Sequence, residues 1–146
     1  WTNVERINIT VNDVDVIHAE WAHYTPGRAV FDNDFKGTQT YDVSNISMTN
    51  IRVEGDILSL VDIQMSDNAT GSYNDVAFRN VSVSGRVTGT NIISGAKAGA
   101  GRVRNIAFVD LNIGGKCVVG AEAGKFEIDA ATTSNISFHC SEAENS

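Results

Sequence analysis

The chain has little proline, few cysteines, few basic residues and no long hydrophobic run. Its 146 residues include one proline, two cysteines and three histidines, and the formal net charge is −7. No apolar stretch approaches the roughly 20 residues that a membrane-spanning helix needs. An acidic chain is a poor partner for nucleic acid or an anionic membrane, and two cysteines are too few for a structural zinc site. We therefore expect no membrane span, no nucleic-acid partner, no metal and no cofactor.

Apolar residues at helical spacing are also missing, and the chain instead repeats one nine-residue phrase about every 30 residues. Copies begin at Asn45, Asp75 and Asn105, a partial copy begins at Asn135, and an earlier copy begins at Asn8, 37 residues before Asn45. Internal repeats of this length are typical of solenoid proteins. At this chain length we expect one domain, residues 1–146.

The phrase itself predicts strands and corners. If its first Asn or Asp is position zero, positions one, three, six and eight are apolar in every complete copy. Alternation with period two predicts strands, and the skip between positions three and six predicts that one strand ends there and another begins. Position five predicts a tight turn, because its Asn and Asp side chains tolerate left-handed backbone; it is occupied by Asp13, Asn50, Asn80 and Asp110. Position ten predicts a second corner with positive φ; it is occupied by Gly55, Gly85 and Gly115.

Several short strands per repeat, joined by such corners, predict an all-β right-handed parallel β-helix of about four to five coils. Further strands are expected at Leu60–Met65, Thr90–Ser94 and Lys116–Val119. Leucine-rich repeats have periods of 20–29 residues and a leucine-dominated consensus, which this chain lacks. Right-handedness follows from the crossover rule for parallel strands. No amphipathic helix precedes the first strand, so we expect the N-terminal end of the solenoid to be uncapped.

In an apparently extracellular chain, the two cysteines and the glycosylation triplets are candidates for modification, although four of the five triplets follow from the repeat itself. A lone pair, Cys117 and Cys140, favours a disulfide. However, the two occupy positions twelve and five of their repeats, so simple stacking does not bring them together and the unpaired state stays open. Asn68 lies in a polar loop and is the expected glycosylation site. Asn80 also begins a glycosylation triplet, but we expect its corner to be buried.

The first repeat is longer than the others by seven residues, which fall between Ile17 and Tyr41. Long insertions on a solenoid often form its binding face. Aromatic side chains beside carboxylates suit carbohydrate, so we expect the substrate-binding residues to be Trp21, His23, Tyr24, Arg28, Asp32, Asp34 and Lys36. The alternative is that the insertion's aromatic residues form a small satellite core. Asp32 and Asp34 could face one way as a carboxylate pair, but Asp-Asn-Asp is more often a turn or a weak cation site, so we assign no catalytic residue.

The repeated phrase resembles those of pectinase-type right-handed β-helices. Several runs resemble the C-terminal coils of the dextranase/isopullulanase family of glycoside hydrolases: Trp1-Thr2, Ile9-Thr10-Val11, Val14-Asp15-Val16-Ile17-His18, Val43-Ser44-Asn45-Ile46-Ser47-Met48, Asn112-Ile113-Gly114-Gly115-Lys116 and Lys125-Phe126-Glu127-Ile128-Asp129. The resemblance covers most of the chain, and it implies an endo-acting, inverting hydrolase of α-glucan with aspartates as acid and base. In that family the catalytic aspartates lie on coils before the stretch that Trp1 begins, so none is assigned here.

We therefore expect the C-terminal section of a secreted polysaccharide hydrolase acting on an α-glucan such as dextran. A missing or partner N-terminal segment would supply the catalytic aspartates, and the isolated chain would be inactive. The chain begins with Trp1 rather than Met and shows no signal peptide, which suggests a processed or excised piece. Two alternatives remain open. Copies of the chain could stack end to end into an extracellular fibre, or the chain could be a carbohydrate-binding or adhesin module.

Overall fold

The computed structural model describes residues 8–17, 29–34 and 40–141, and within these ranges every regular element is a β-strand. The strands are β1 (Ile9–Val16), β2 (Phe31–Asp34), β3 (Val43–Val53), β4 (Val61–Gln64), β5 (Ser72–Val83), β6 (Asn91–Ser94), β7 (Arg102–Ile113), β8 (Lys116–Cys117), β9 (Phe126–Ile128) and β10 (Thr133–His139). None of these ranges contains a helix with the length and apolar character needed to cross a membrane.

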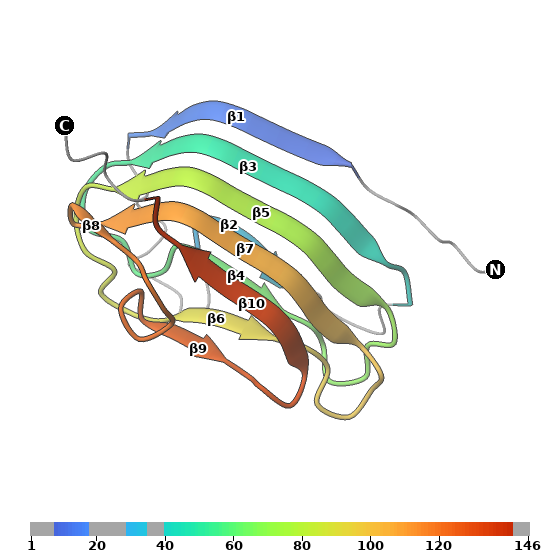
Figure 1. Ribbon diagram of the computed structural model, residues 1–146. Coiled ribbons are helices and arrows are strands. Elements are labelled where there is room, and N and C mark those ends of the chain that lie inside the picture. Colours follow the sequence, from blue (N-terminus) through green and yellow to red (C-terminus); the bar gives the residue numbers. More distant parts are fainter. Residues whose placement is uncertain (1–7, 18–28, 35–39, 142–146) are drawn as a thin grey trace.

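The strands stack into two parallel sheets (Figure 1). Sheet A has the order β1-β3-β5-β7-β10, and sheet B has the order β2-β4-β6-β9. The short strand β8 pairs with β7 and is the one antiparallel strand among the described elements. This arrangement confirms a parallel β-solenoid. About three turns are complete, while sheet A extends to five parallel levels and sheet B to four. Two of the three further strands expected from the sequence are present with slightly narrower bounds, as β4 and β6. The third, expected at Lys116–Val119, is only the two-residue antiparallel strand β8.

The 30-residue period sets the register of sheet A from β3 to β10, because residues 30 apart in the sequence pair across neighbouring strands. Phe78 pairs with Phe108 across β5 and β7, and Phe108 pairs with Phe138 across β7 and β10. The rings of Phe78 and Phe108 stack with centroids 4.9 Å apart, and those of Phe108 and Phe138 with centroids 5.0 Å apart. Equivalent apolar positions therefore form continuous columns inside the solenoid, and these columns are its core.

The predicted left-handed residue at position five is confirmed, but the prediction that one strand ends there and another begins was wrong, because β3, β5 and β7 run through this position. Asp13, Asn50, Asn80 and Asp110 all have positive φ, between 51° and 56°. Position zero is a second left-handed corner that the sequence did not predict, with positive φ at Asn45, Asp75, Asn105 and Asn135. Both corners use Asn or Asp, the residues that enter this region at least cost among those with a side chain. Each long strand of sheet A therefore bends at these two positions.

The glycines at position ten do not all serve one purpose. Gly55 and Gly115 have positive φ, of 81° and 77°, as predicted. Gly85 does not, and here the prediction was wrong. A Cβ at Gly85 would lie only 2.3 Å from the carbonyl carbon of Gly55, so Gly85 is required by the close approach of the preceding coil.

Side-chain amides at the corners form ladders along the solenoid. Nδ2 of Asn80 donates to Oδ1 of Asn50 at 2.8 Å, and Nδ2 of Asn50 donates to Oδ1 of Asp13 at 2.9 Å. A second ladder runs from Asn135 through Asn105 to Asp75. The expectation that Asn80 is buried was wrong, because its side chain lies at the surface. Its amide is nevertheless engaged by the ladder.

The two ends of the solenoid differ. At β1, Ile9 is 40% exposed, whereas the residue at the same position of the next coil, Ile46, is 4% exposed. Among the described residues no strand pairs with the other edge of β1, which agrees with the expected uncapped end. At the other end, a disulfide joins Cys117 to Cys140, with Cα atoms 6.1 Å apart. The pairing is confirmed, and the β7–β8 hairpin explains it, because the chain turns back after β7 instead of continuing in register.

Candidate functional site

Sheet B presents a row of polar side chains on its outer face. Val61, Ile63 and Ile93 point into the core, and the residues that alternate with them point outward. The register aligns four outward positions on successive strands: Asp32, Asp62, Ile92 and Glu127. Neighbouring strands lie about 4.8 Å apart, so the row places the carboxyl groups of Asp32 and Asp62 on adjacent strands and that of Glu127 two strands further on.

A hollow of about 460 Å³ lies beside this row, within the size range of small-molecule sites. We call it the sheet B hollow, and its lining residues are Gln64, Ile92, Ile93, Ser94, Lys97, Glu127, Ile128 and Asp129. They come from β4, β6 and β9 and from the connections that follow β6 and β9. The lining combines an apolar floor with two carboxylates, an amide, a hydroxyl and an ammonium group, which together can bind the hydroxyls of a sugar ring.

Asp62 has an unusual environment for a carboxylate, since it is only 2% exposed although it occupies an outward position. Its Oδ1 accepts a hydrogen bond of 2.7 Å from Nε2 of Gln64. A carboxylate with so little accessible surface cannot reach a polysaccharide directly. We infer that Asp62 instead fixes the orientation of Gln64, whose side chain borders the hollow.

The carboxylate of Asp129 is similarly occupied, by hydrogen bonds within its own turn. Its carboxylate accepts hydrogen bonds from the hydroxyl of Thr132 at 2.8 Å and from the N–H of Ala131 at 3.0 Å. These bonds hold the turn between β9 and β10 at the edge of the sheet B hollow. Glu127 is exposed and has no such bond within the described part of the chain. Glu127 is therefore the carboxylate of this hollow that is best placed to contact a ligand.

Of the seven predicted substrate-binding residues, two lie on sheet B. Asp32 and Asp34 are both on β2, so this segment is a strand and not the turn that Asp-Asn-Asp favours, and Asp32 is exposed. The other five lie outside the described residues: Trp21, His23, Tyr24, Arg28 and Lys36. Phe31 belongs to the main core instead of a satellite core, because its ring meets the edge of Phe78 with centroids 5.2 Å apart.

Sequence reasoning missed Asp62, Gln64 and Glu127. The 30-residue period could have identified the first two. Asp62 and Gln64 follow Asp32 and Asp34 by 30 residues and pair with them in register. The turn 118–125 shifts the period at β9, so that Glu127 follows its in-register neighbour Ile92 by 35 residues. A strict 30-residue count therefore does not find Glu127.

The resolved charge pairs of the structure lie away from sheet B. Asp15 and Arg52 form an ion pair across β1 and β3, and this hydrogen bond lowers the pKa of the Asp15 carboxyl. Hydrogen bonds from the side chain and backbone of Arg86 lower the pKa of Asp56. No group of three or more His, Cys, Asp or Glu that could hold a metal ion occurs in the described part of the chain. Asn68 is exposed in the turn between β4 and β5, and its glycosylation stays a prediction.

Comparison of the chain with protein-family models, with curated proteins and with solved structures finds no match.

Proposed function

We propose that the chain is the C-terminal section of a secreted polysaccharide hydrolase, and that the outer face of sheet B contributes to its saccharide-binding cleft. The observation that carries this proposal is the sheet B hollow, in which exposed Glu127, Gln64 and Ser94 surround the apolar side chain of Ile92. Parallel strands repeat these groups along the solenoid axis at about 4.8 Å, which suits an extended polymer better than a single small ligand.

The substrate class in this proposal is an α-glucan such as dextran, as the family resemblance implies. Asp62 is nearly inaccessible, and Asp129 is committed to its turn, so neither is proposed as an acid or base. The catalytic aspartates belong to a preceding or partner segment, and the isolated chain is expected to bind but not to cleave. Secretion is supported by the Cys117–Cys140 disulfide, since disulfides persist mainly in oxidising compartments.

Glycan titrations of the chain test the binding role. We expect dextran or pullulan oligosaccharides to shift the backbone amide NMR signals of Ile92, Ser94 and Glu127. Replacing Glu127 by Gln should weaken binding about fivefold, because the charged acceptor is lost. The matched control is Glu54→Gln, which makes the same change at an exposed position on the sheet A side. Equal weakening in both variants, or no shift with any glycan, would refute the binding role. Hydrolysis by the isolated chain would contradict the assignment of catalysis to another segment.

A second function, end-to-end assembly into a fibre, is favoured by the exposed strand β1. Ile9 and Val14 are accessible there, while the residues at the same positions of the following coils are buried. A further coil, from a second copy or from a companion chain, would cover them and pair with the free edge. Size-exclusion chromatography and electron microscopy separate the cases. Long polymers support the fibre, a defined complex with a companion chain supports the hydrolase section, and a stable monomer would argue against self-stacking.

A further inference from the structure

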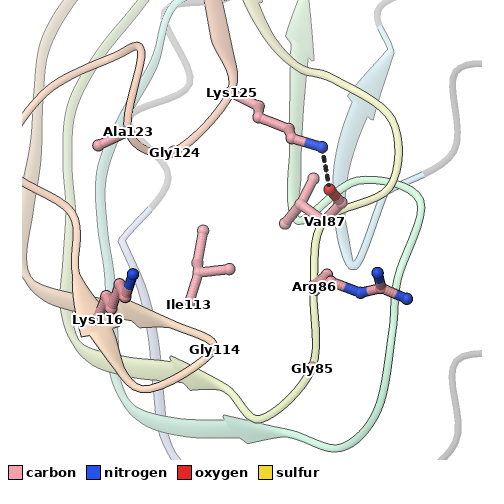
Figure 2. A pocket seen from close by; sticks show the side chains of 9 residues that line it. All are labelled: Gly85, Arg86, Val87, Ile113, Gly114, Lys116, Ala123, Gly124 and Lys125. Atoms are coloured by element: carbon pink, nitrogen blue, oxygen red, sulfur yellow. Dashed lines mark hydrogen bonds between the residues drawn. The ribbon is translucent and has the colours of Figure 1, made fainter.

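A second hollow lies at the corner where the chain passes from sheet A to sheet B, on a different part of the surface from the sheet B hollow (Figure 2). Its volume is about 290 Å³. We call it the corner hollow, and it is lined by Gly85, Arg86, Val87, Ile113, Gly114, Lys116, Ala123, Gly124 and Lys125. Its walls come from the connection after β5, from the β7–β8 hairpin and from the turn before β9.

The corner hollow lies where the repeat loses a side-chain hydrogen-bond acceptor. One coil earlier, the hydroxyl of Ser84 at position nine accepts a hydrogen bond of 2.9 Å from the N–H of Gly55. In the next coil position nine is Gly114, whose N–H still bonds to Val83 in register but which has no hydroxyl to offer. As a result the N–H of Gly85 has no hydrogen-bond acceptor among the described residues.

All the charged side chains that line the corner hollow are cationic. Lys116 lies on the β7–β8 hairpin, and Figure 2 shows it on the opposite side of the hollow from Lys125. Nζ of Lys125 donates a hydrogen bond of 2.8 Å to the carbonyl oxygen of Val87, which leaves two of its three protons for a ligand. Lys116 forms no ion pair or hydrogen bond through its side chain within the described ranges.

Arg86 contributes less positive charge to the interior of the corner hollow than the two lysines do. Its guanidinium is paired with Asp56 at 2.9 Å, and Figure 2 shows the side chain extending away from the interior of the hollow. The charged residues of the lining are positive, whereas the chain as a whole carries a net charge of −7. Two ammonium groups and one unsatisfied N–H around a hollow without a carboxylate favour an anion at this place.

The geometry points to the corner hollow as a binding site for the oxyanion group of a small organic molecule. A carboxylate, sulfate or phosphate group binds to Lys116, Lys125 and the N–H of Gly85. The organic part rests on Val87, Ile113 and Ala123, which form the apolar wall. The volume of about 290 Å³ lies at the lower limit of small-molecule pockets and suits a molecule of about the size of one sugar unit. This site is separate from the sheet B hollow and does not depend on the proposed function.

The test is an NMR titration of the chain with four probes: glucuronate, glucose 6-phosphate, inorganic phosphate and neutral glucose. We expect the three anions to shift the amide signals of Gly85, Gly114 and Gly115, and glucose to leave them unchanged. Tighter binding of the sugar anions than of inorganic phosphate would show that the apolar wall contacts the organic part. Equal binding would confirm the oxyanion contact but refute the organic ligand. Absence of any shift with the anions would refute the site.

Charge-removing variants locate the site. Lys116→Gln should weaken anion binding about fivefold, and Lys125→Asn should weaken it as well. Asn is chosen at position 125 because Lys125 has a φ of 53°, which Asn tolerates. The control is Arg104→Gln, which removes one positive charge from an exposed residue near the other end of β7. Lys116→Arg keeps the charge and should keep most of the binding. An equal effect of Arg104→Gln would show a general charge effect and overturn the proposal.

Discussion

The first coil and the interior coils carry the same apolar pattern but bury it to very different degrees. At position six, Val14 is 36% exposed, while Val81 is fully buried. The residue type and the strand geometry are the same, and the register of sheet A connects the two positions through Ile51. The difference is that the interior coil has a neighbour on both sides. In a solenoid, therefore, burial is a property of the stack and not of the repeated phrase.

The coil that contains β10 is intermediate in burial between the first coil and the interior coils. Phe138 of β10 is half-buried, yet its ring stacks on Phe108 and meets the edge of Phe126, with centroids 5.1 Å apart in the second contact. The disulfide holds the residue that directly follows this strand to the β7–β8 hairpin. The C-terminal end is thus held by aromatic contacts and a covalent bond. In the first coil, β1 has neither, and the described aromatic contact is that of Phe31 on β2 with Phe78.

The largest difference between interior and end is expected at the phenylalanine column. Phe108→Ala removes a buried ring that contacts Phe78, Phe126 and Phe138, and it should lower the free energy of unfolding by about 3–5 kcal/mol. Phe138→Ala should cost less, because this side chain is only half-buried. Urea denaturation of both variants measures the difference. Equal losses would mean that the last coil is as well packed as the interior.

The next largest effect concerns the disulfide at the C-terminal end. The double variant Cys117→Ser and Cys140→Ser opens a loop with a sequence separation of 23 residues. The chain-entropy model gives a loss of about 3 kcal/mol in the free energy of unfolding. Hydrogen exchange should accelerate more in β10 than in β3, because β10 is the strand that the bond tethers. A uniform acceleration across all strands would contradict a local role, and reduction of the wild-type chain provides the matched comparison.

The same substitution at position six of two coils tests directly how burial differs between the first coil and an interior coil. Val81→Ala removes two buried methyl groups and should lower the free energy of unfolding by about 2 kcal/mol. Val14→Ala makes the same change where the side chain is already exposed, and it should cost less than about 1 kcal/mol. Urea denaturation measures both. If a further coil covers β1 in an assembly, the Val14 variant should instead weaken that assembly, which chromatography at several protein concentrations would detect.

Much of sheet A could be predicted from the sequence, because each of its features recurs. The left-handed corner at Asn50, Asn80 and Asp110 was visible from residue type and period alone. The corner at position zero was missed. The sequence marks it in the same way, because the buried residues Val43 and Ile46 on either side of Asn45 lie three positions apart. The prediction for Gly85 was wrong because glycine is required in two different situations: where φ is positive, and where another part of the backbone leaves no room for a Cβ. Only the position of the preceding coil distinguishes the two.

The candidate site was predicted less well than the fold. The sequence directed attention to the insertion of the first coil, while the described hollow beside sheet B is made by later coils. Asp62 could have been found by adding the period to Asp32, but its near-complete burial depends on packing that the period does not encode. The disulfide was left open for a related reason. The reversal of the chain at Gly114 and Gly115, which brings Cys117 close to Cys140, breaks the repeat.

The smallest expected effect is a pH dependence at the C-terminal end. Hydrogen bonds from the N–H and the hydroxyl of Ser141, at 2.6 and 2.8 Å, lower the pKa of the Asp110 carboxyl, with a smaller contribution from His139. Because the folded pKa lies below the unfolded value of about 3.9, this stabilisation is fully present above that value and is lost as the pH falls through the folded pKa. The Ser141 amide signal should therefore shift below pH 4 in an NMR titration, as the hydrogen bonds to Asp110 are lost. Asp110→Asn should abolish the shift, whereas Ser141→Ala, which keeps the N–H donor, should retain part of it. A shift that persists in Asp110→Asn would assign the titration to another group and remove Asp110 as the anchor of this end.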